Sequence, residues 1–128
     1  MSAETVQASL NRRFTYRADA GECWRILKGE GPVFGDCEDY SLTLIWLLEG
    51  RSMVRFWWAL ITCKYVLWHC LSPRGAGHAV VWCRGRGWTD NIQRRMVARL
   101  PAGYRLRFPY LVPLVLLKFL FRPLLKRI

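Results

Sequence analysis

Three residues of the chain are of the types that carry out nucleophilic chemistry on a carbonyl group. Cys37 follows Asp36, whose carboxylate can accept hydrogen bonds from the free N–H groups of a helix's first turn. In that turn the partial positive charge of the helix favours the thiolate, which is the form that attacks carbonyls. His78 and Asp90 follow along the chain, and they can supply a base and a group that fixes its tautomer. The residue types therefore predict a Cys-His-Asp triad.

The chain has one other histidine, and the local sequence favours His78 over it. Gly77 leaves room for a close approach to His78, whereas His69 lies inside an apolar run. Simpler interpretations stay open for the other two members. Cys37 could be a buried structural thiol, with a pKa that its acidic neighbours raise, and Asp90 could form an Asx turn with Asn91. The coincidence of three roles in one chain favours catalysis.

The elements that must position these residues can be outlined from the sequence. A helix is predicted over residues 37–48, with Gly50 as its stop, and its apolar composition makes it central to the core. Residues 54–62 are rich in aromatic and aliphatic side chains and predict a buried strand. The other expectations are a helix over 3–11 ending near Asn11, an extended piece over 14–16, a loop over 29–35, a strand over 64–71, a turn over 72–75, and β-rich runs over 78–83 and 87–92.

The last two runs predict a hairpin whose register decides whether the triad can form. Side chains alternate faces along a strand, and directly paired residues share a face. A two-residue loop would pair Cys83 with Trp88 and place His78 and Asp90 on opposite faces. A three-residue loop over 84–86 pairs Cys83 with Gly87 and places them on one face. We therefore predict an odd-length loop or a bulge with a glycine at positive φ. The His78 ring should then lie within hydrogen-bond reach of Asp90 and near the Cys37 sulfur.

Composition sets the broad class. With 128 residues, 52% apolar and 23% charged, the chain is expected to be globular. The net charge of +11 favours an anionic partner, which could be a membrane, a nucleic acid or an acidic substrate. Nucleic acid is disfavoured, because the Trp57-Trp58 pair fits a core or groove wall better than a base-stacking platform. Residues 1–14 lack an apolar core of signal-peptide length, so a reduced, cytoplasmic protein is expected.

The motif around the cysteine resembles that of a known family. Gly35-Asp36-Cys37-Glu38-Asp39-Tyr40 is similar to the cysteine motif of the bacterial transglutaminase-like cysteine peptidases, the LapG-like family. Gly77-His78-Ala79-Val80-Val81 is similar to the family's histidine strand, and Trp88-Thr89-Asp90-Asn91 to its aspartate strand. A weaker upstream likeness involves Asn11 and the pattern Phe14-x-Tyr16-x-x-Asp19. The resemblance covers about residues 10–108.

The resemblance implies a fold and an activity. The fold would be α+β, a papain-like transglutaminase core in which the cysteine helix packs on a small antiparallel sheet. The activity would be that of a cysteine peptidase acting on a protein substrate through a thioester. Cys37 would be the nucleophile, His78 the base and acid, Asp90 the orienting group, and the Cys37 N–H the oxyanion donor with help from Asn11. Transglutaminase or deamidase chemistry uses the same triad, and a non-catalytic membrane- or nucleic-acid-binding module is the rival of another class.

The chemistry requires no cofactor, but the resemblance raises the question of calcium. Members of the family bind calcium through acidic residues beside the cysteine, which correspond here to Asp36, Glu38 and Asp39. Three carboxylates within four residues could hold a hard cation. They could equally be a charge cluster at a helix N-terminus, and both interpretations stay open.

The chain divides into a catalytic domain over residues 1–108 and an apolar, basic tail over 109–128. Residues 111–125 are nearly all apolar, and Lys118, Arg122 and Lys126 would form one basic stripe on a helix. Fifteen helical residues span about 22 Å, which is short of a bilayer's core of about 30 Å. The pattern slightly favours a helix lying in the interface of an anionic membrane over a terminal helix packed on the domain.

Overall fold

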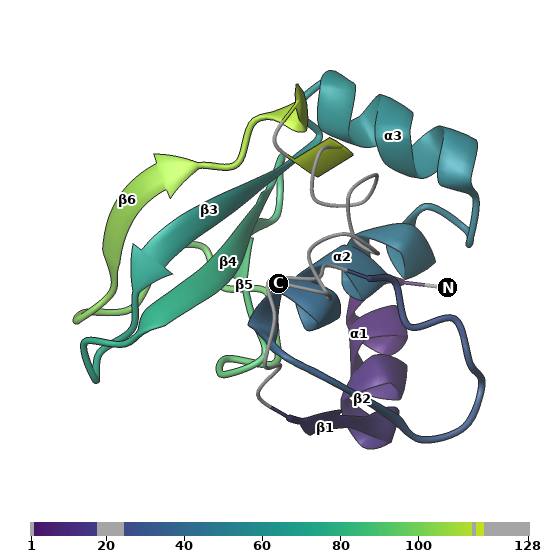
Figure 1. Ribbon diagram of the computed structural model, residues 1–128, viewed down its shortest axis with the longest axis horizontal. Coiled ribbons are helices and arrows are strands. Elements are labelled where there is room, and N and C mark those ends of the chain that lie inside the picture. Colours follow the sequence, from purple (N-terminus) through teal and green to yellow (C-terminus); the bar gives the residue numbers. More distant parts are fainter. Residues whose placement is uncertain (1, 18–24, 114, 117–128) are drawn as a thin grey trace, which may run out of the picture.

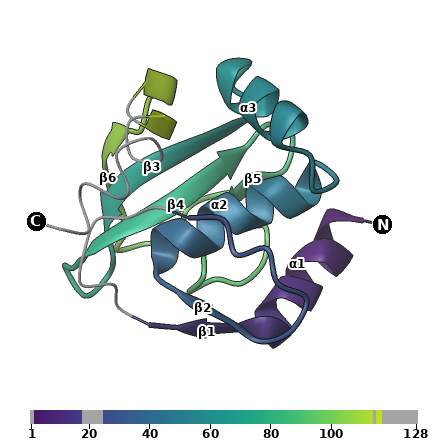
Figure 2. The same cartoon turned by 45° about the vertical axis from the view of Figure 1, so that its right-hand side comes forward.

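The computed structural model describes residues 2–17, 25–113, 115 and 116. Within them the chain combines helices with a two-stranded and a four-stranded sheet, which confirms the α+β class (Figures 1 and 2). The larger sheet has the strand order β5-β4-β3-β6 and is antiparallel throughout. The elements are α1 (Ala3–Arg13), β1 (Phe14–Tyr16), β2 (Val33–Gly35), α2 (Cys37–Leu48), α3 (Met53–Ile61), β3 (Tyr65–Leu71), β4 (Gly77–Cys83), β5 (Gly87–Thr89) and β6 (Arg105–Pro109).

The cysteine helix α2 has the bounds that the sequence predicted. Asp36 is its N-cap, and its side chain accepts a hydrogen bond from the Asp39 N–H while the Asp39 side chain accepts one from the Asp36 N–H. This reciprocal pair satisfies two backbone donors that the helix leaves free. The helix ends before Gly50, whose φ of 73° suits a residue without a Cβ.

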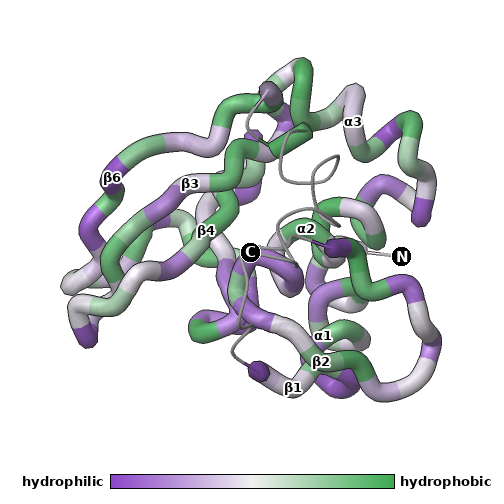
Figure 3. Tube along the Cα trace, in the orientation of Figure 1, coloured by the Kyte–Doolittle hydropathy of each residue, from purple (hydrophilic) through white to green (hydrophobic). Residues whose placement is uncertain are grey.

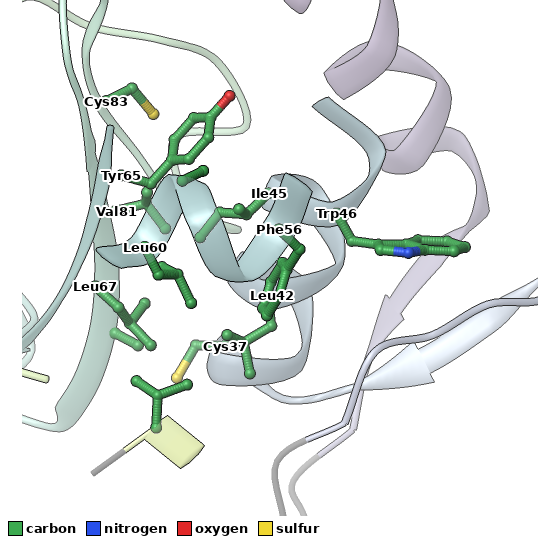
Figure 4. Packing of buried hydrophobic residues seen from close by; sticks show 13 residues of the cluster. Cys37, Leu42, Ile45, Trp46, Phe56, Leu60, Tyr65, Leu67, Val81 and Cys83 are labelled. Atoms are coloured by element: carbon green, nitrogen blue, oxygen red, sulfur yellow. The ribbon is translucent and has the colours of Figure 1, made fainter. Parts of the chain in front are cut away.

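Helix α2 is the centre of the molecule, between the larger sheet and α1 (Figure 2). Its residues 39–46 are all buried. One apolar cluster joins α2 and α3 to the inner face of the sheet (Figure 4), and a smaller one joins α2 to α1 and β2. Burial on all sides explains why α2 is apolar around its whole circumference.

The prediction of a buried strand over residues 54–62 is wrong, because this segment is helix α3. Ser52 caps it by accepting a hydrogen bond from the Arg55 N–H. Phe56, Ala59 and Leu60 are buried at helical spacing and pack into the main core. The apolar residues on its outer side hid this period in the sequence.

Two smaller boundaries also differ from expectation. The loop predicted over 29–35 ends in strand β2, which pairs in parallel with β1. The run predicted over 87–92 is a strand only as far as Thr89, after which the chain turns. The predicted strand over 64–71 and the turn after it are confirmed.

The hairpin of β4 and β5 has the odd-length loop that the triad requires. Cys83 pairs with Gly87 and Val81 with Thr89, so residues 84–86 form the loop. Gly85 and Gly87 have φ values of 77° and 106°. A Cβ on Gly87 would lie 2.1 Å from the Val97 carbonyl oxygen, so glycine is needed there for close packing as well as for its φ.

The start of the tail packs on the domain. Val115 is 1% exposed and belongs to the same apolar cluster as Cys37, and Tyr110 and Val112 pack against that cluster. This favours the packed interpretation for the residues up to 116. Residues 117–128, with the predicted basic stripe, lie outside the described residues, as do Cys23 and the Asp19 of the upstream pattern. No helix of the described part is both long enough and apolar enough to cross a bilayer.

Candidate active site

His78 and Asp90 form a buried pair at the edge of the sheet. His78 Nε2 lies 2.8 Å from Asp90 Oδ2, as the register argument required. Asp90 is fully buried and His78 nearly so. Because an ionised carboxylate only accepts hydrogen bonds, Nε2 carries the proton of the neutral ring. The tautomer leaves Nδ1 with a free lone pair, which is what a general base needs.

Asp90 forms the predicted Asx turn as well as the histidine contact. Its Oδ1 accepts hydrogen bonds from the backbone N–H groups of Ile92 and Gln93, at 3.0 and 2.6 Å. Its Oδ2 is shared by His78 and by the Tyr104 hydroxyl, which donates at 2.8 Å. The two interpretations of Asp90 are thus compatible, because each oxygen serves one of them. Four donors hold the carboxylate in a single orientation.

Tyr104 is a functional candidate that sequence reasoning missed. Burial raises the pKa of its phenol to about 12, so at neutral pH the hydroxyl keeps its proton and donates a hydrogen bond to Asp90. Its ring centroid lies 6.1 Å from that of His78. The sequence carries no signal for this contact, since a lone tyrosine before β6 reaches the site only through the tertiary fold.

Cys37 occupies the first position of α2, as predicted, but its thiol is hydrogen-bonded to the side chain of the next residue, Glu38. Its Sγ lies 3.1 Å from Glu38 Oε2 and donates a hydrogen bond to that oxygen. Burial raises the pKa of the Cys37 thiol far above its usual value, and the Glu38 carboxylate raises it further. The expectation that the helix N-terminus would favour the thiolate is therefore wrong for this conformation. Desolvation and a neighbouring negative charge outweigh the helix dipole.

Cys37 and His78 are near neighbours without a direct bond. The Ala79 N–H hydrogen-bonds toward the Cys37 thiol, and this contact lowers the thiol pKa. Ala79 and Val81 belong to the cluster that contains Cys37, so the His78 side chain alternates away from it. Among the described residues no hydrogen bond joins the thiol to the imidazole, so the prediction that the ring lies near the sulfur is not confirmed. The structure brings together His78 and Asp90 and places the thiol at the backbone of Ala79, the next residue.

Asn11 has a structural role in place of the predicted oxyanion contact. It lies inside α1, which continues to Arg13, so it is not the end of the helix. Its Oδ1 accepts a hydrogen bond from Tyr40 at 2.5 Å, and its Nδ2 donates to the Arg94 carbonyl at 2.7 Å. Both polar atoms of the amide are therefore used in linking α1 to α2 and to the segment after Asp90.

A buried glutamine completes this link. Gln7 Nε2 donates to the Tyr40 hydroxyl at 3.0 Å and to Thr89 Oγ1 at 2.5 Å. Thr89 precedes Asp90, so this network fixes the end of β5 against the two helices. The buried Oε1 of Gln7 has no hydrogen-bond partner among the described residues. Sequence reasoning passed over Gln7, although a polar side chain on the core face of a helix is a recognisable signal.

The three carboxylates around Cys37 all accept hydrogen bonds from groups of the protein itself. Asp36 and Asp39 cap α2, Glu38 accepts from the thiol, and Asp39 also lies 3.5 Å from Arg25 Nε. Burial, and then the charge of Asp36, raise the pKa of Asp39 to about 7. In the described part of the chain no three acidic, histidine or cysteine side chains are grouped as metal ligands. The capping contacts favour the charge-cluster interpretation, and calcium binding stays a prediction.

Gly35 is the residue that lets this segment start the helix so tightly. A Cβ at Gly35 would lie 2.7 Å from Asp39 Oδ2 and 2.8 Å from its Cβ. Any larger residue would push the Asp39 side chain away from the Asp36 N–H, which it caps. The glycine before Asp36 in the motif therefore has a steric cause that the structure makes explicit.

Comparison of the chain with models of protein families, with curated proteins and with solved structures finds no match. The arguments for function therefore depend on the geometry of the site.

Replacing Glu38 with Gln should shift the ionisation of Cys37 to lower pH. The change removes the negative charge that raises the thiol pKa and keeps a side chain of similar size. The pH dependence of Cys37 alkylation by iodoacetamide, followed by peptide mass spectrometry, should move to a lower midpoint. Glu30→Gln is the matched control, because its side chain is 87% exposed and should leave the profile unchanged. An unchanged midpoint in Glu38→Gln would show that the carboxylate does not hold the thiol in its neutral form.

Replacing Tyr104 with Phe should slow the reaction of Cys37 without unfolding the protein. The loss of one hydrogen bond to Asp90 should cost about 1 kcal/mol of stability and loosen the carboxylate that orients His78. We expect the rate of Cys37 acylation to fall by about fivefold, because about 1.4 kcal/mol corresponds to a factor of ten. Tyr16→Phe, at a tyrosine that is 58% exposed, serves as the control. Equal rates for wild type and Tyr104→Phe would limit Tyr104 to a packing role.

Proposed function

We propose that this protein is a cysteine hydrolase of the papain-like transglutaminase type, which cleaves an amide bond of a protein substrate through a thioester. The observation that carries the proposal is the buried His78–Asp90 pair, together with the hydrogen bond from the N–H of the next residue, Ala79, to the Cys37 thiol. A histidine with a fixed tautomer and a cysteine at a helix N-terminus are the parts that thiol-dependent acyl transfer needs. The resemblance of the Cys37 motif to the peptidase family points in the same direction.

The described conformation corresponds to a resting state in this proposal. The thiol is neutral and bonded to Glu38, and His78 Nδ1 has a free lone pair. The reaction needs a second conformation in which the sulfur leaves Glu38 and the imidazole turns toward it, because the described His78 side chain alternates away from the cluster that contains Cys37.

The chemical steps follow from these positions. The thiol proton passes to His78 Nδ1, and the sulfur attacks the substrate carbonyl. The negative oxygen that forms would be stabilised by first-turn N–H groups of α2, including that of Cys37. The imidazolium gives its proton to the leaving amine as the carbon–nitrogen bond breaks. Water, deprotonated by the same imidazole, then attacks the thioester, the carbon–sulfur bond breaks to release the acid, and the imidazolium returns its proton to the Cys37 sulfur.

A second function is favoured by one observation, the raised pKa of the Cys37 thiol. A thiol held neutral by burial and by Glu38 fits a non-catalytic binding module on the same fold as well as it fits a resting enzyme. Within the enzymatic proposal, an amine in place of water as the acceptor would give transglutaminase chemistry. The same acyl-enzyme serves both reactions, so the acceptor decides between them.

The experiment that tests the proposal is a comparison of proteomes exposed to the wild-type protein and to Cys37→Ala. New N-termini that depend on Cys37 would establish peptide-bond cleavage. Cys37-dependent glutamine–lysine cross-links, or deamidated glutamines, without new N-termini would assign the acyl transfer to the other acceptors. Identical product lists from the two proteins would contradict the enzymatic proposal and leave the binding module.

A further inference from the structure

Helix α3 presents an apolar ridge to solvent on the side that faces away from the core. Val54, Trp58 and Ile61 recur at helical spacing, and their exposed fractions are 81%, 66% and 57%. The opposite side of the same helix carries Phe56, Ala59 and Leu60 in the core. Figure 1 shows α3 at the periphery of the molecule, at its upper right. A nine-residue helix that is apolar on both sides has an exposed outer face of the kind that marks an interaction site.

Basic side chains border this ridge. A groove of about 370 Å³ runs beside Val54 and Trp58, and its other walls include Arg55, Lys64 and Arg84. The acidic residue in the groove, Glu49, is buried and accepts hydrogen bonds from Lys64 and from the Tyr65 hydroxyl. Its charge is therefore compensated within the protein, so the rim is positive.

The part of the sequence that contains α3 is also strongly basic. Residues 50–128 hold 15 of the 20 Lys and Arg residues, but they hold one of the nine acidic residues, Asp90. Asp90 is fully buried in the candidate site, so it does not offset the positive surface. Helix α3 lies within this basic part of the sequence, and Figure 3 shows polar segments next to its hydrophobic ones. A partner of this surface must be anionic and must also accept aliphatic side chains.

We propose that α3 docks the protein on an anionic phospholipid surface. Val54, Trp58 and Ile61 enter the boundary between headgroups and acyl chains, and Arg55 and Arg84 contact the lipid phosphates. Trp58 has the residue type that is enriched at such boundaries. Nucleic acid fits less well, because bases offer no apolar phase to Val54 and Ile61. A second copy of the chain fits less well too, because a symmetric contact would bring the same arginines together.

This surface shares no residue with the candidate active site or with the sequence of the predicted tail helix. Its residues lie in α3 and in the adjoining Thr62–Lys64 and hairpin segments, which the structure describes in full. The inference does not depend on the catalytic proposal. A protein without enzymatic activity could still bind lipid through α3.

The test is sedimentation of the full chain with vesicles of phosphatidylcholine, with and without phosphatidylserine. The wild-type protein should bind the anionic vesicles preferentially, and added salt should weaken the binding. Trp58→Ser/Ile61→Ser should lower the partition coefficient by roughly tenfold or more. Leu106→Ser, at a residue of β6 that is 41% exposed, is the apolar control and should bind like the wild type. Thermal melting of each variant by circular dichroism establishes that it is folded.

Two charge-reversal variants test the contribution of the basic residues. Arg55→Glu should reduce binding to the anionic vesicles, whereas Arg74→Glu, in the exposed turn at the far end of β3, should reduce it less. Wild-type binding by Trp58→Ser/Ile61→Ser would overturn the proposal and place lipid binding elsewhere, for example in the tail. Equal losses in variants and controls would overturn it as well. A DNA affinity or a dimer that disappears in Trp58→Ser/Ile61→Ser, without vesicle binding by the wild type, would assign the surface to that other partner.

Discussion

Replacing His78 with Ala should lower Cys37-dependent hydrolysis of an activated ester by about a thousandfold, within the range of 10² to 10⁴ that a general base contributes. The thiol pKa is raised by burial and by Glu38, so without an imidazole to accept the proton very little thiolate forms at neutral pH. The measurement is the release of nitrophenolate, compared among wild type, His78→Ala and Cys37→Ala. Because the triad acts as a unit, the two variants should be about equally impaired.

The other histidine provides the matched control. His69 stacks on Phe108, with ring centroids 4.8 Å apart, and lies on β3 away from Asp90. His69→Ala should therefore keep the wild-type rate. Asp90→Asn should lose much of the rate, because the amide would no longer fix the His78 tautomer. A His78→Ala protein as active as His69→Ala would remove His78 from the mechanism.

Replacing Val115 with Asp should destabilise the domain by about 3 kcal/mol or more, the cost of burying a charge without a partner. Val115 is 1% exposed and packs into the cluster that also holds Cys37, Leu67 and Ala79. The prediction is checked by urea unfolding followed by tryptophan fluorescence. The result matters because it decides whether residues 109–116 belong to the domain or to a separable tail.

Leu111→Asp is the control for this variant. Leu111 is in the same segment and is 65% exposed, so its replacement should change the unfolding free energy by about 0.5 kcal/mol or less. If Val115→Asp proved as stable as Leu111→Asp, the segment would not be part of the core. That result would support the predicted division of the chain at residue 108.

The local features of the fold could be predicted from the sequence. Asp36, Asp39 and Gly50 carry the start and stop signals of α2 within a few residues of its ends. The register of the β4–β5 hairpin followed from parity, because His78 and Asp90 can share a face only across an odd loop. In both cases the information lies in short-range spacing, which the sequence displays directly.

The features that were missed depend on tertiary context. Helix α3 is apolar on its buried and on its exposed side, so residues 54–62 show neither a clear helical period nor an alternation. The contact of Tyr104 with Asp90 joins residues that only the fold brings together. The bond between the Cys37 thiol and Glu38 depends on a side-chain rotamer and on burial, and the sequence encodes neither locally.

The central claim is that Cys37 is activated by His78, and the two thiols Cys37 and Cys63 allow a direct measurement. Cys63 is exposed and Cys37 is buried, so accessibility alone would favour labelling of Cys63 by a peptidyl epoxide. The account predicts the reverse ratio, read by peptide mass spectrometry, with Cys37 labelled faster in the wild type and only slowly in His78→Ala. Preferential labelling of Cys63 in both proteins, with Cys37 inert, would contradict it.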